Sequence, residues 1–355
     1  MGQAYNYDGL KQLQSLPLKY KIRMTEERIK AWYESWVQYE ILDLETQKTR
    51  TVTIDTRGAF MDPPMKDSEL VMAARPGQVY LSFSGGKDST VLRHIVKSLY
   101  EDVPAVFVDT GLEYPEVRKF ATQNADVVLR PAMRFDEVIK TYGYPVATKR
   151  VADAVEGARR NPNSSRAQQM RGEYGGRLDG KQSKFSYTKW LYLMDAPFKI
   201  SAKCCDVMKK APIKKYGKET GRMPIIGTLA SESQARKAEW FKSGCNAFNS
   251  PYPTSRPLSF WTEQDILQYI KEHDLPYASV YGDIVEDDAG QLRTSDCDRT
   301  GCMFCCFGCH LEDKPNRFQR MKETHPRQYE YCMRPIEEKG LGLQEVLDYI
   351  GVDYQ

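Results

Sequence analysis

A glycine-rich turn between an apolar strand and a helical segment constrains the fold of this chain more than any other feature. The apolar run Val79–Phe83 predicts a short buried strand, and residues 90–99 follow helical spacing. Between them, residues 84–89 read Ser-Gly-Gly-Lys-Asp-Ser. Glycines let a backbone approach a ligand closely, and the amides and dipole at a helix N-terminus attract anions. We therefore predict a phosphate-binding loop here, rather than a plain glycine turn before a helix.

The loop residues supply the groups that a nucleotide phosphate needs. Ser84 and Ser89 offer hydroxyl donors, Lys87 adds a positive charge, and Asp88 can hold Mg²⁺ or cap the helix. The loop lacks the Walker order Gly-x-x-x-x-Gly-Lys-Ser/Thr. We assign catalytic roles to Lys87 and Asp88. The predicted nucleotide-binding residues of this region are Ser82, Phe83, Ser84, Gly85, Gly86, Lys87, Asp88 and Ser89.

Strands and helices alternate beyond the loop. Residues 103–108 and 127–129 read as further strands, residues 115–124 and 135–142 as helices, and the pattern resumes with a strand at 223–227. This alternation predicts an α/β fold, a parallel twisted sheet with helices on both faces. Ligands of such sheets bind beyond the carboxyl ends of the strands.

The remaining segments suggest three parts. We expect an N-terminal helical extension over 1–74, with a helix at 24–45 and a short strand at 49–56. The main domain then spans 75–310, and a helical extension covers 311–355. Within the main domain, Thr262 and Asp265 form a capping-box pattern that predicts a helix running to His273.

Charge is distributed unevenly along the 355 residues. The net charge is only +3, but residues 149–222 carry 18 basic and seven acidic side chains. Asn161–Ser165 and Gly172–Gly180 interrupt any helix there, so we expect a mobile, polar excursion. It is either a solvated lid or a surface for phosphates or nucleic acid. The N-terminus has no apolar core like that of a signal peptide, and no apolar run is long enough to span a membrane, so we expect a cytoplasmic protein without a membrane partner.

Most of the nine cysteines lie in two local groups, which is typical of metal ligands in a reducing compartment rather than of a disulfide framework. Cys204 and Cys205 are adjacent, and a Cys-rich motif covers residues 297–310. A Cys-Cys pair fits a cluster edge better than a zinc knuckle, which favours a 4Fe–4S cluster. A zinc site from Cys297, Cys302, Cys305 and Cys309 is the alternative, and ordinary thiols a third.

Several motifs resemble those of a known protein family and occur along the chain in the same order as in that family. The segment SGGKDS after VYLSF resembles the PP-loop of the ATP pyrophosphatases, and residues 106–117 are similar to the second motif of the PAPS reductase family of that superfamily. The likeness continues through residues 203–212, 227–236 and 261–281 to about residue 310. It implies an adenine nucleotide ligand. It also implies a 4Fe–4S ligand set of Cys204, Cys205, Cys302 and Cys305, with Cys297 and Cys309 as alternates.

The resemblance also extends the nucleotide site. It implies that the residues after the second strand contact the nucleoside. It also implies that the third motif holds phosphate or sulfate, and we assign Arg236 of this motif a catalytic role. Asp109 has a simpler alternative as a turn or capping residue, and Lys237 is read as a surface charge. The residues concerned are Asp109, Thr110, Gly111, Gly227, Ser233 and Arg236.

Two departures from the reductase pattern bear on the reaction. The C-terminal Glu-Cys-Gly-Leu-His signature does not occur, and the phosphate loop is complete whereas reductases usually carry a degenerate form. We therefore expect ATP and Mg²⁺ as ligands, adenylylation of an acceptor with pyrophosphate release, and sulfur transfer, with nucleic acid as an acceptor and a separate sulfur-donor protein. A sulfonucleotide reductase and an inactive nucleotide-sensing regulator are the alternatives. We also expect a homo-oligomer.

Overall fold

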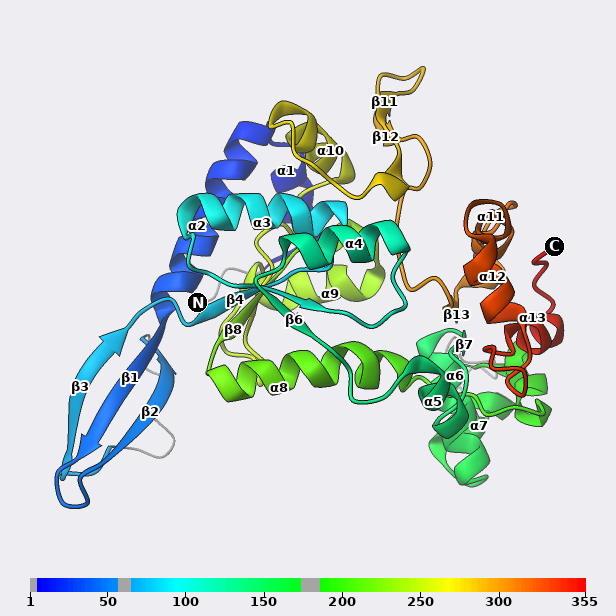
Figure 1. Ribbon diagram of the computed structural model, residues 1–355, viewed down its shortest axis with the longest axis horizontal. Helices are drawn as coiled ribbons and strands as arrows, with labels where there is room; N and C mark the ends of the chain where they lie inside the picture. The colour runs from blue at the N-terminus through cyan, green and yellow to red at the C-terminus, as the bar shows by residue number, and fades with distance from the viewer. Residues whose placement is uncertain (1–4, 57–64, 174–185) are drawn as a thin grey trace. The chain divides into compact units, whose positions relative to one another are not determined.

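The computed structural model describes residues 5–56, 65–173 and 186–355 (Figure 1). They pack as two compact units, which are described separately. The first unit comprises residues 1–109, 115–129 and 213–300, and the second comprises residues 110–114, 130–212 and 301–355. The boundaries expected at residues 74 and 310 divide the chain into consecutive segments, whereas each of these units combines several segments. The expected boundaries therefore stay predictions.

A mostly parallel sheet in the order β6-β5-β4-β8-β10-β9 forms the core of the first unit. Its strands are β4 (Val79–Ser82), β5 (Ala105–Val108), β6 (Val127–Leu129), β8 (Met223–Ile226), β9 (Asn246–Ala247) and β10 (Thr254–Ser255). Strand β4 pairs in parallel with both β5 and β8, whereas β9 is antiparallel to β10. Helices α3 (Lys87–Leu99) and α4 (Pro115–Asn124) cover one face, and α8 (Ala211–Thr220) covers the other (Figure 1). The predicted α/β fold is confirmed.

Strand order decides where a ligand can lie. The chain runs from β4 outward to β5 and β6, and later returns to the other side of β4 as β8. Such a reversal leaves a crevice at the carboxyl ends of the strands on either side of it. Phe83, Asp109 and Gly227 directly follow the carboxyl ends of β4, β5 and β8. The predicted site residues of three distant segments therefore share one edge of the sheet.

Further helices complete the first unit. They are α1 (Tyr7–Gln14), α2 (Leu18–Ser35), α9 (Gln234–Ser243) and α10 (Glu263–Glu272), with short 3₁₀ turns at Ala230–Glu232 and Ser279–Tyr281 and a hairpin of β11 (Ile284–Glu286) and β12 (Leu292–Thr294). Helix α2 buries Ile29 and Trp32 completely. The capping box at Thr262 is confirmed, because its side chain accepts from the Asp265 amide and Asp265 accepts from the Thr262 amide.

The helix predicted for residues 24–45 is wrong at both ends. Helix α2 ends at Ser35, and the next residues form β1 (Trp36–Asp43). Strand β1 lies between β2 (Lys48–Asp55) and β3 (Glu69–Arg75) in an antiparallel sheet. Val37, Tyr39 and Ile41 alternate along β1, a period-2 pattern that suits a strand once partners are present on both sides. The expected strand at 49–56 is confirmed as β2.

The second unit is mainly helical around an apolar core. Its helices are α5 (Phe135–Thr141), α6 (Lys149–Arg160), α7 (Ser165–Arg171), α11 (Arg317–Thr324), α12 (Pro326–Met333) and α13 (Leu343–Ile350), and short 3₁₀ segments cover Thr188–Asp195 and Cys309–Leu311. Strand β7 (Val146–Ala147) pairs in parallel with β13 (Cys306–Phe307). The helical reading of the region after Leu311 is confirmed.

The basic segment 149–222 is more ordered than the sequence indicated. Its described part is largely helical, and Val151, Ala154 and Val155 of α6 are almost completely buried. Helices α6 and α7 end at the interruptions that were predicted, while most of the stretch Gly172–Gly180 lies outside the described residues. The expectation of a polar excursion without helices is therefore wrong for the described part, whereas its mobility stays a prediction. Small apolar side chains at helical spacing, between the charges, let α6 pack into the core.

None of the described helices is both long and apolar enough to cross a membrane.

Candidate nucleotide site and cysteine pocket

The phosphate loop joins β4 to α3 in the first unit. Gly85 has a positive φ of 75°, and a Cβ there would lie 2.7 Å from the Cβ of Ala121 and 2.9 Å from the Val117 carbonyl oxygen. Only glycine fits this turn. Gly86 is the N-cap of α3 and brings no side chain to cap it. The amides of the first turn therefore receive no cap from the N-cap residue itself, which leaves room for an anion at this helix end.

Serine hydroxyls hold the loop in shape. Ser84 Oγ lies 3.0 Å from Ser89 Oγ, which donates to the Gly86 carbonyl at 2.9 Å. Gly227, at the end of β8, passes so close that a Cβ would lie 3.2 Å from the Asp88 carbonyl oxygen. Gly227 thus allows β8 to approach the loop. The structure brings together the predicted residues Ser84, Gly85, Gly86, Ser89 and Gly227.

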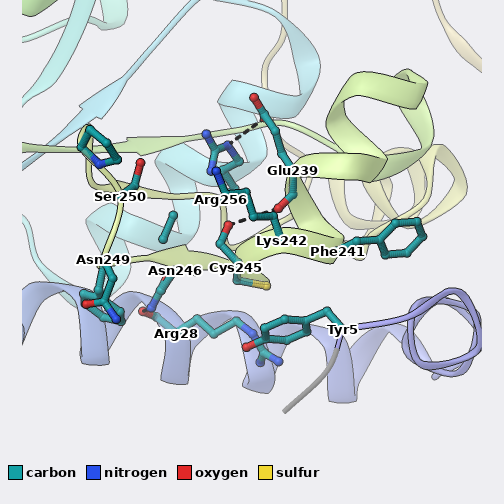
Figure 2. Close-up of a pocket in the computed structure, with 14 residues that line it drawn as sticks. Tyr5, Arg28, Glu239, Phe241, Lys242, Cys245, Asn246, Asn249, Ser250 and Arg256 are labelled. Atoms are coloured by element: carbon teal, nitrogen blue, oxygen red, sulfur yellow. Dashed lines mark hydrogen bonds and ion pairs between the residues drawn. The ribbon is translucent and has the colours of Figure 1, made fainter. Parts of the chain in front are cut away.

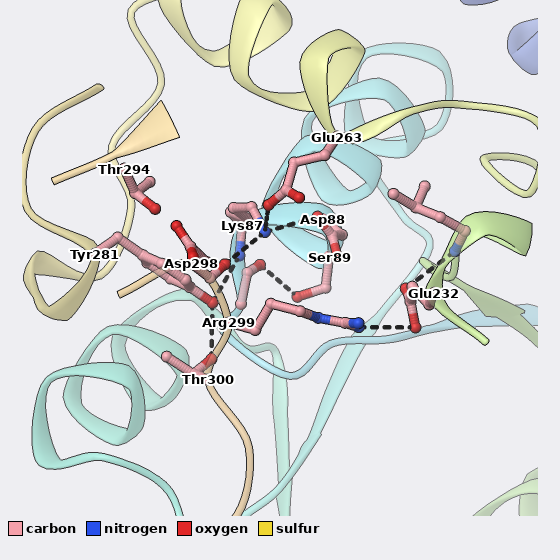
Figure 3. Close-up of polar contacts among 12 residues, drawn as sticks. Lys87, Asp88, Ser89, Glu232, Glu263, Tyr281, Thr294, Asp298, Arg299 and Thr300 are labelled. Carbon is pink, nitrogen blue, oxygen red and sulfur yellow. Dashed lines mark hydrogen bonds and ion pairs between the residues drawn. The ribbon is translucent and has the colours of Figure 1, made fainter. Parts of the chain in front are cut away.

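Lys87 is buried, and groups from distant segments surround its ammonium (Figure 3). Its Nζ lies 2.9 Å from Glu263 Oε1, donates to the Asp298 carbonyl at 3.0 Å and lies 3.7 Å from Asp88 Oδ1. Burial would lower the pKa of Lys87, but Asp88 and the hydrogen bond to Glu263 outweigh it and raise the pKa above its ordinary value. Lys87 is therefore charged at neutral pH.

Asp88 is the least satisfied carboxyl of this site. Within the described part of the chain, its Oδ1 is buried and accepts no hydrogen bond. Burial raises its pKa, opposed by Lys87 and reinforced by Glu232. An ionised carboxylate of this kind gains from a cation ligand. The predicted role of Asp88 in holding Mg²⁺ is compatible with this position.

The other predicted nucleotide residues have protein partners. Asp109 is buried and accepts from Arg118 Nε at 2.6 Å and from Nη2 at 2.8 Å. Thr110 Oγ1 donates to Glu113 at 2.7 Å. Ser233 is the N-cap of α9, and Arg236 lies 2.7 Å from Glu232. Their roles toward a ligand stay predictions, as do those of Ser82, Phe83 and Gly111.

Sequence reasoning missed the residues that surround the loop from the other side. Tyr281 Oη accepts from the Lys87 amide at 3.4 Å and lies 2.7 Å from Thr300 Oγ1. Arg299 lies 3.1 Å from Glu232, which therefore contacts two arginines. The capping box at Thr262 placed Glu263 in the first turn of a helix, but no sequence signal pointed that helix at Lys87.

Four cysteines line one apolar pocket in the second unit. They are the predicted set of Cys204, Cys205, Cys302 and Cys305, with Leu112, Phe135, Pro145, Met208, Lys209 and Phe304. A π-helical turn at Asp206–Lys210 follows the adjacent pair. Such turns are frequent at functional sites. Two segments almost a hundred residues apart therefore meet at this pocket.

Charges beside the pocket favour a thiolate at Cys205. The hydrogen bond donated by Cys204, opposed by burial and aided by Lys149 and Lys209, lowers the pKa of Cys205 to about 5. Burial would lower the pKa of Lys209, but Cys302 and Glu113 outweigh it and raise that pKa. The hydrogen bond to Cys205 raises the pKa of Cys204, and burial raises the pKa of Cys302 and, to about 11, that of Cys305. A cation beside several thiols is the environment in which thiolates form.

The alternate cysteines lie elsewhere. Cys297 belongs to the first unit, and its thiol donates to the Arg299 carbonyl at 3.1 Å. Cys309 is buried and donates to the Cys306 carbonyl, also at 3.1 Å. Among the residues that the structure describes, no group of three or more His, Cys, Asp or Glu side chains is arranged to hold a metal ion.

The comparisons with known proteins agree with the loop and the sheet. Residues 78–130 and 167–307 match the phosphoadenosine phosphosulfate reductase domain, the PAPS reductase family. This chain belongs to that family. The match begins at β4 and ends beside Cys305 and Cys306, so it includes both the phosphate loop and the four cysteines. The PAPS reductase family is part of the PP-loop superfamily, as the resemblance of SGGKDS indicated.

Two proteins of Methanocaldococcus jannaschii, both described as uncharacterized, are similar to this PAPS reductase family member. One is 23% identical over 279 residues, which are 75% of this chain and 49% of that relative. The other is 38% identical over 73 residues, or 19% of this chain and 15% of the relative. The chain spans about half the length of the first relative.

Proposed function

We propose that this protein activates an acceptor by adenylylation with ATP and then transfers sulfur to it. The observation that carries the proposal is the complete phosphate loop, in which a charged Lys87 stands beside Asp88, whose buried Oδ1 accepts no hydrogen bond from the described residues. A ligand with β- and γ-phosphates and a divalent cation would use both groups.

The proposed chemistry has two balanced steps. An acceptor oxygen attacks the α-phosphorus, the bond to the β-phosphate oxygen breaks, and pyrophosphate leaves. A sulfur nucleophile at the oxidation level of hydrosulfide then displaces AMP from the activated acceptor. The loop amides and Lys87 neutralise charge on the phosphates during the first step. Asp88 is the residue that would hold Mg²⁺, which supplies charge neutralisation when bound.

Pyrophosphate release tests this proposal. Wild-type protein with Mg·ATP, hydrosulfide and total RNA as the acceptor should release pyrophosphate, and Lys87→Ala or Asp88→Ala should lower the rate by at least about a hundredfold. Lys237→Ala, a substitution of a lysine on α9 outside the loop, is the matched control and should retain the wild-type rate. Normal turnover by Lys87→Ala would show that the loop is not the phosphate site.

Family membership supports a second candidate, the reduction of a sulfonucleotide by a thiol to sulfite. The same purified protein decides between the two reactions. Sulfite released from adenylyl sulfate or its 3′-phosphorylated form, without pyrophosphate from ATP, would replace our first proposal. Binding of nucleotides without turnover of either substrate would point to a regulator.

We further propose that Cys204, Cys205, Cys302 and Cys305 hold a 4Fe–4S cluster. The support is that these cysteines line one apolar pocket beside Lys209. A cluster is larger than a single ion, so its thiolates stand further apart than the ligands of one zinc. When bound, such a cluster would supply a redox centre or a strong local charge beside Cys205 and Lys209.

Purification without oxygen tests the cluster. The protein should be brown, with broad absorbance near 400 nm and about four irons per chain, and Cys302→Ser should remove the colour. Cys332→Ser is the control, because this buried cysteine does not line the pocket and should leave iron content unchanged. Colourless protein with one zinc per chain would support the alternative instead.

A further inference from the structure

A second pocket lies in the first unit, away from the phosphate loop. Its volume is about 970 Å³, in the range of small-molecule sites. It lies beside β9, β10 and the end of α9, with α2 along one side (Figure 2). Helix α9 begins at Gln234, next to Ser233 of the nucleotide site, and the pocket lining begins on this helix at Glu239, about 9 Å along the helix axis from Ser233. Neither proposed reaction uses this pocket.

The pocket is positively charged. Arg28, Lys242 and Arg256 line it, and Glu239 is its single acidic lining residue among those described, which leaves a balance of +2. Figure 2 shows Arg28 and Arg256 on opposite sides of Cys245. Arg28 is near enough to the Cys245 thiol to affect its pKa, and the Arg256 amide donates to the Cys245 carbonyl at 2.7 Å. Lys242, in the last turn of α9, offsets the partial negative charge of that helix end.

Arg256 has more donors than its protein contacts use. Its side chain is 20% exposed, and its ion pair with Glu239 is long, at 3.5 Å, to a carboxylate that is 53% exposed. Burial lowers the pKa of Arg256 more than Glu239 raises it, and the nearby Arg236 lowers it further, so the charge of Arg256 is incompletely compensated. A guanidinium carries five N–H donors in a planar fork that matches a phosphate.

Neutral groups complete the lining. Asn249 and Ser250 offer amide and hydroxyl groups, and Tyr5 forms an aromatic wall (Figure 2). The position of Tyr5 is specific, because it packs on Gly244, where φ is 63° and a Cβ would lie 2.3 Å from the ring. Its ring also contacts Trp240 edge-on at 5.2 Å. Cys245 is a wall rather than a nucleophile, since burial raises the pKa of its thiol.

We propose that this pocket binds the phosphate of a nucleotide, with Arg28 and Arg256 as the charged contacts and Tyr5 against the nucleoside. One guanidinium would satisfy a carboxylate, whereas two guanidiniums, an ammonium and hydroxyl and amide donors match a doubly charged group with several acceptor oxygens. The nucleotide comes either free from solution or as the 5′-phosphorylated terminal residue of an RNA strand. Both present the same phosphate and base.

Calorimetric titration in a Lys87→Ala background tests the proposal, because that substitution weakens phosphate binding at the loop. The probes are UMP, a short 5′-phosphorylated uridine oligoribonucleotide and, as a carboxylate control, succinate. UMP should bind, Arg256→Gln should weaken it by about tenfold, and Glu239→Gln should strengthen it by about threefold. Lys271→Gln, an exposed lysine of α10 outside the pocket, should change nothing.

The two substitutions are expected to change the UMP affinity in opposite directions. Misfolding could not explain this result, because a damaged fold would not bind UMP more tightly. UMP binding as strong as oligonucleotide binding identifies the free nucleotide, and a much stronger oligonucleotide identifies the strand. The proposal is overturned if neither probe binds, if succinate binds equally well, if binding occurs only when Lys87 is intact, or if Arg256→Gln and Glu239→Gln leave the affinity unchanged. None of these outcomes depends on ATP-driven sulfur transfer.

Discussion

At the scale of single residues, groups of the chain itself already pair with the positively charged lysine of the phosphate loop. The Lys87 ammonium contacts the Glu263 carboxylate and the Asp298 carbonyl, and both come from segments beyond residue 260. A nucleotide phosphate that binds Lys87 must therefore compete with Glu263. Glu263 is 48% exposed, so solvent weakens this competition without abolishing it.

The first prediction concerns this competition. Glu263→Gln should strengthen Mg·ATP binding by about three- to tenfold, because a neutral amide holds Lys87 less tightly than a carboxylate does. Equilibrium dialysis with labelled ATP measures the affinity. Glu272→Gln is the control on the same helix, where Glu272 accepts from Gln268 rather than from Lys87. Weaker binding by Glu263→Gln would mean that Glu263 positions Lys87 for the nucleotide.

At the scale of elements, a buried ion pair joins α2 to α10. Lys21 is 2% exposed at its side chain, and its Nζ lies 2.7 Å from Asp265 Oδ2. The same carboxylate accepts from the Thr262 amide and hydroxyl at the start of α10. Glu263 is the first residue of that helix. The pair therefore positions the helix end that contacts Lys87.

Removing the lysine should be costly, because Asp265 would remain buried without its cation. We expect Lys21→Met to lower the free energy of unfolding by about 3–5 kcal/mol, measured by urea denaturation. Lys30→Met, which breaks an exposed pair with Glu27 on the same helix, should cost no more than about 0.5 kcal/mol. Adding Asp265→Asn to Lys21→Met should restore part of the loss. If Lys21→Met and Lys30→Met lowered the free energy of unfolding equally, the stabilising role of the buried Lys21–Asp265 pair would be contradicted.

At the scale of the whole molecule, charge is unevenly shared between residues 149–222 and the rest of the chain. Several of the basic side chains already have internal roles. Arg159 donates to the carbonyls of Leu193, Met194, Ala196 and Phe198. Arg166 pairs with Asp153. Arg150, Arg160 and Lys189 are exposed. A nucleic-acid surface would have to use residues of this exposed kind.

We predict that this segment binds RNA through its exposed charges. Affinity should fall by about 10³–10⁵ over a fourfold increase in salt if six to ten phosphates are contacted, and less steeply for fewer. Arg150, Arg160 and Lys189 changed together to Glu should weaken binding and flatten the slope in filter-binding assays. Arg159 is excluded from the variant because its loss would damage the fold.

The control for this experiment reverses three exposed lysines of the first unit, Lys11, Lys19 and Lys48, and should leave binding nearly unchanged. ATP binding at residues 84–89 should be the same in both triple variants. Salt-independent binding, or none, would return the segment to a purely structural role.

Local sequence patterns determined the strand, loop and helix around Ser84–Ser89, the alternation that follows and the family. These features depend on side-chain period, on glycine where φ is positive and on caps, which residues close in sequence decide. The basic segment 149–222 shows that local patterns do not predict tertiary packing. Its charges suggested a solvated excursion, but the small apolar side chains of α6 gain more from burial against the second unit's core than from solvent.

Only the tertiary structure decided which distant residues meet. Nothing local in the sequence places Glu263, Asp298 and Tyr281 around Lys87, or Lys209 beside Cys302, because these contacts depend on how separate elements pack. The sequence did predict that Cys204, Cys205, Cys302 and Cys305 act together, since thiol spacing and family likeness select ligands that must converge. Packing then lined one pocket with these four and with neither Cys297 nor Cys309. Spacing along a chain indicates the chemistry of its groups, whereas burial and contact determine their partners.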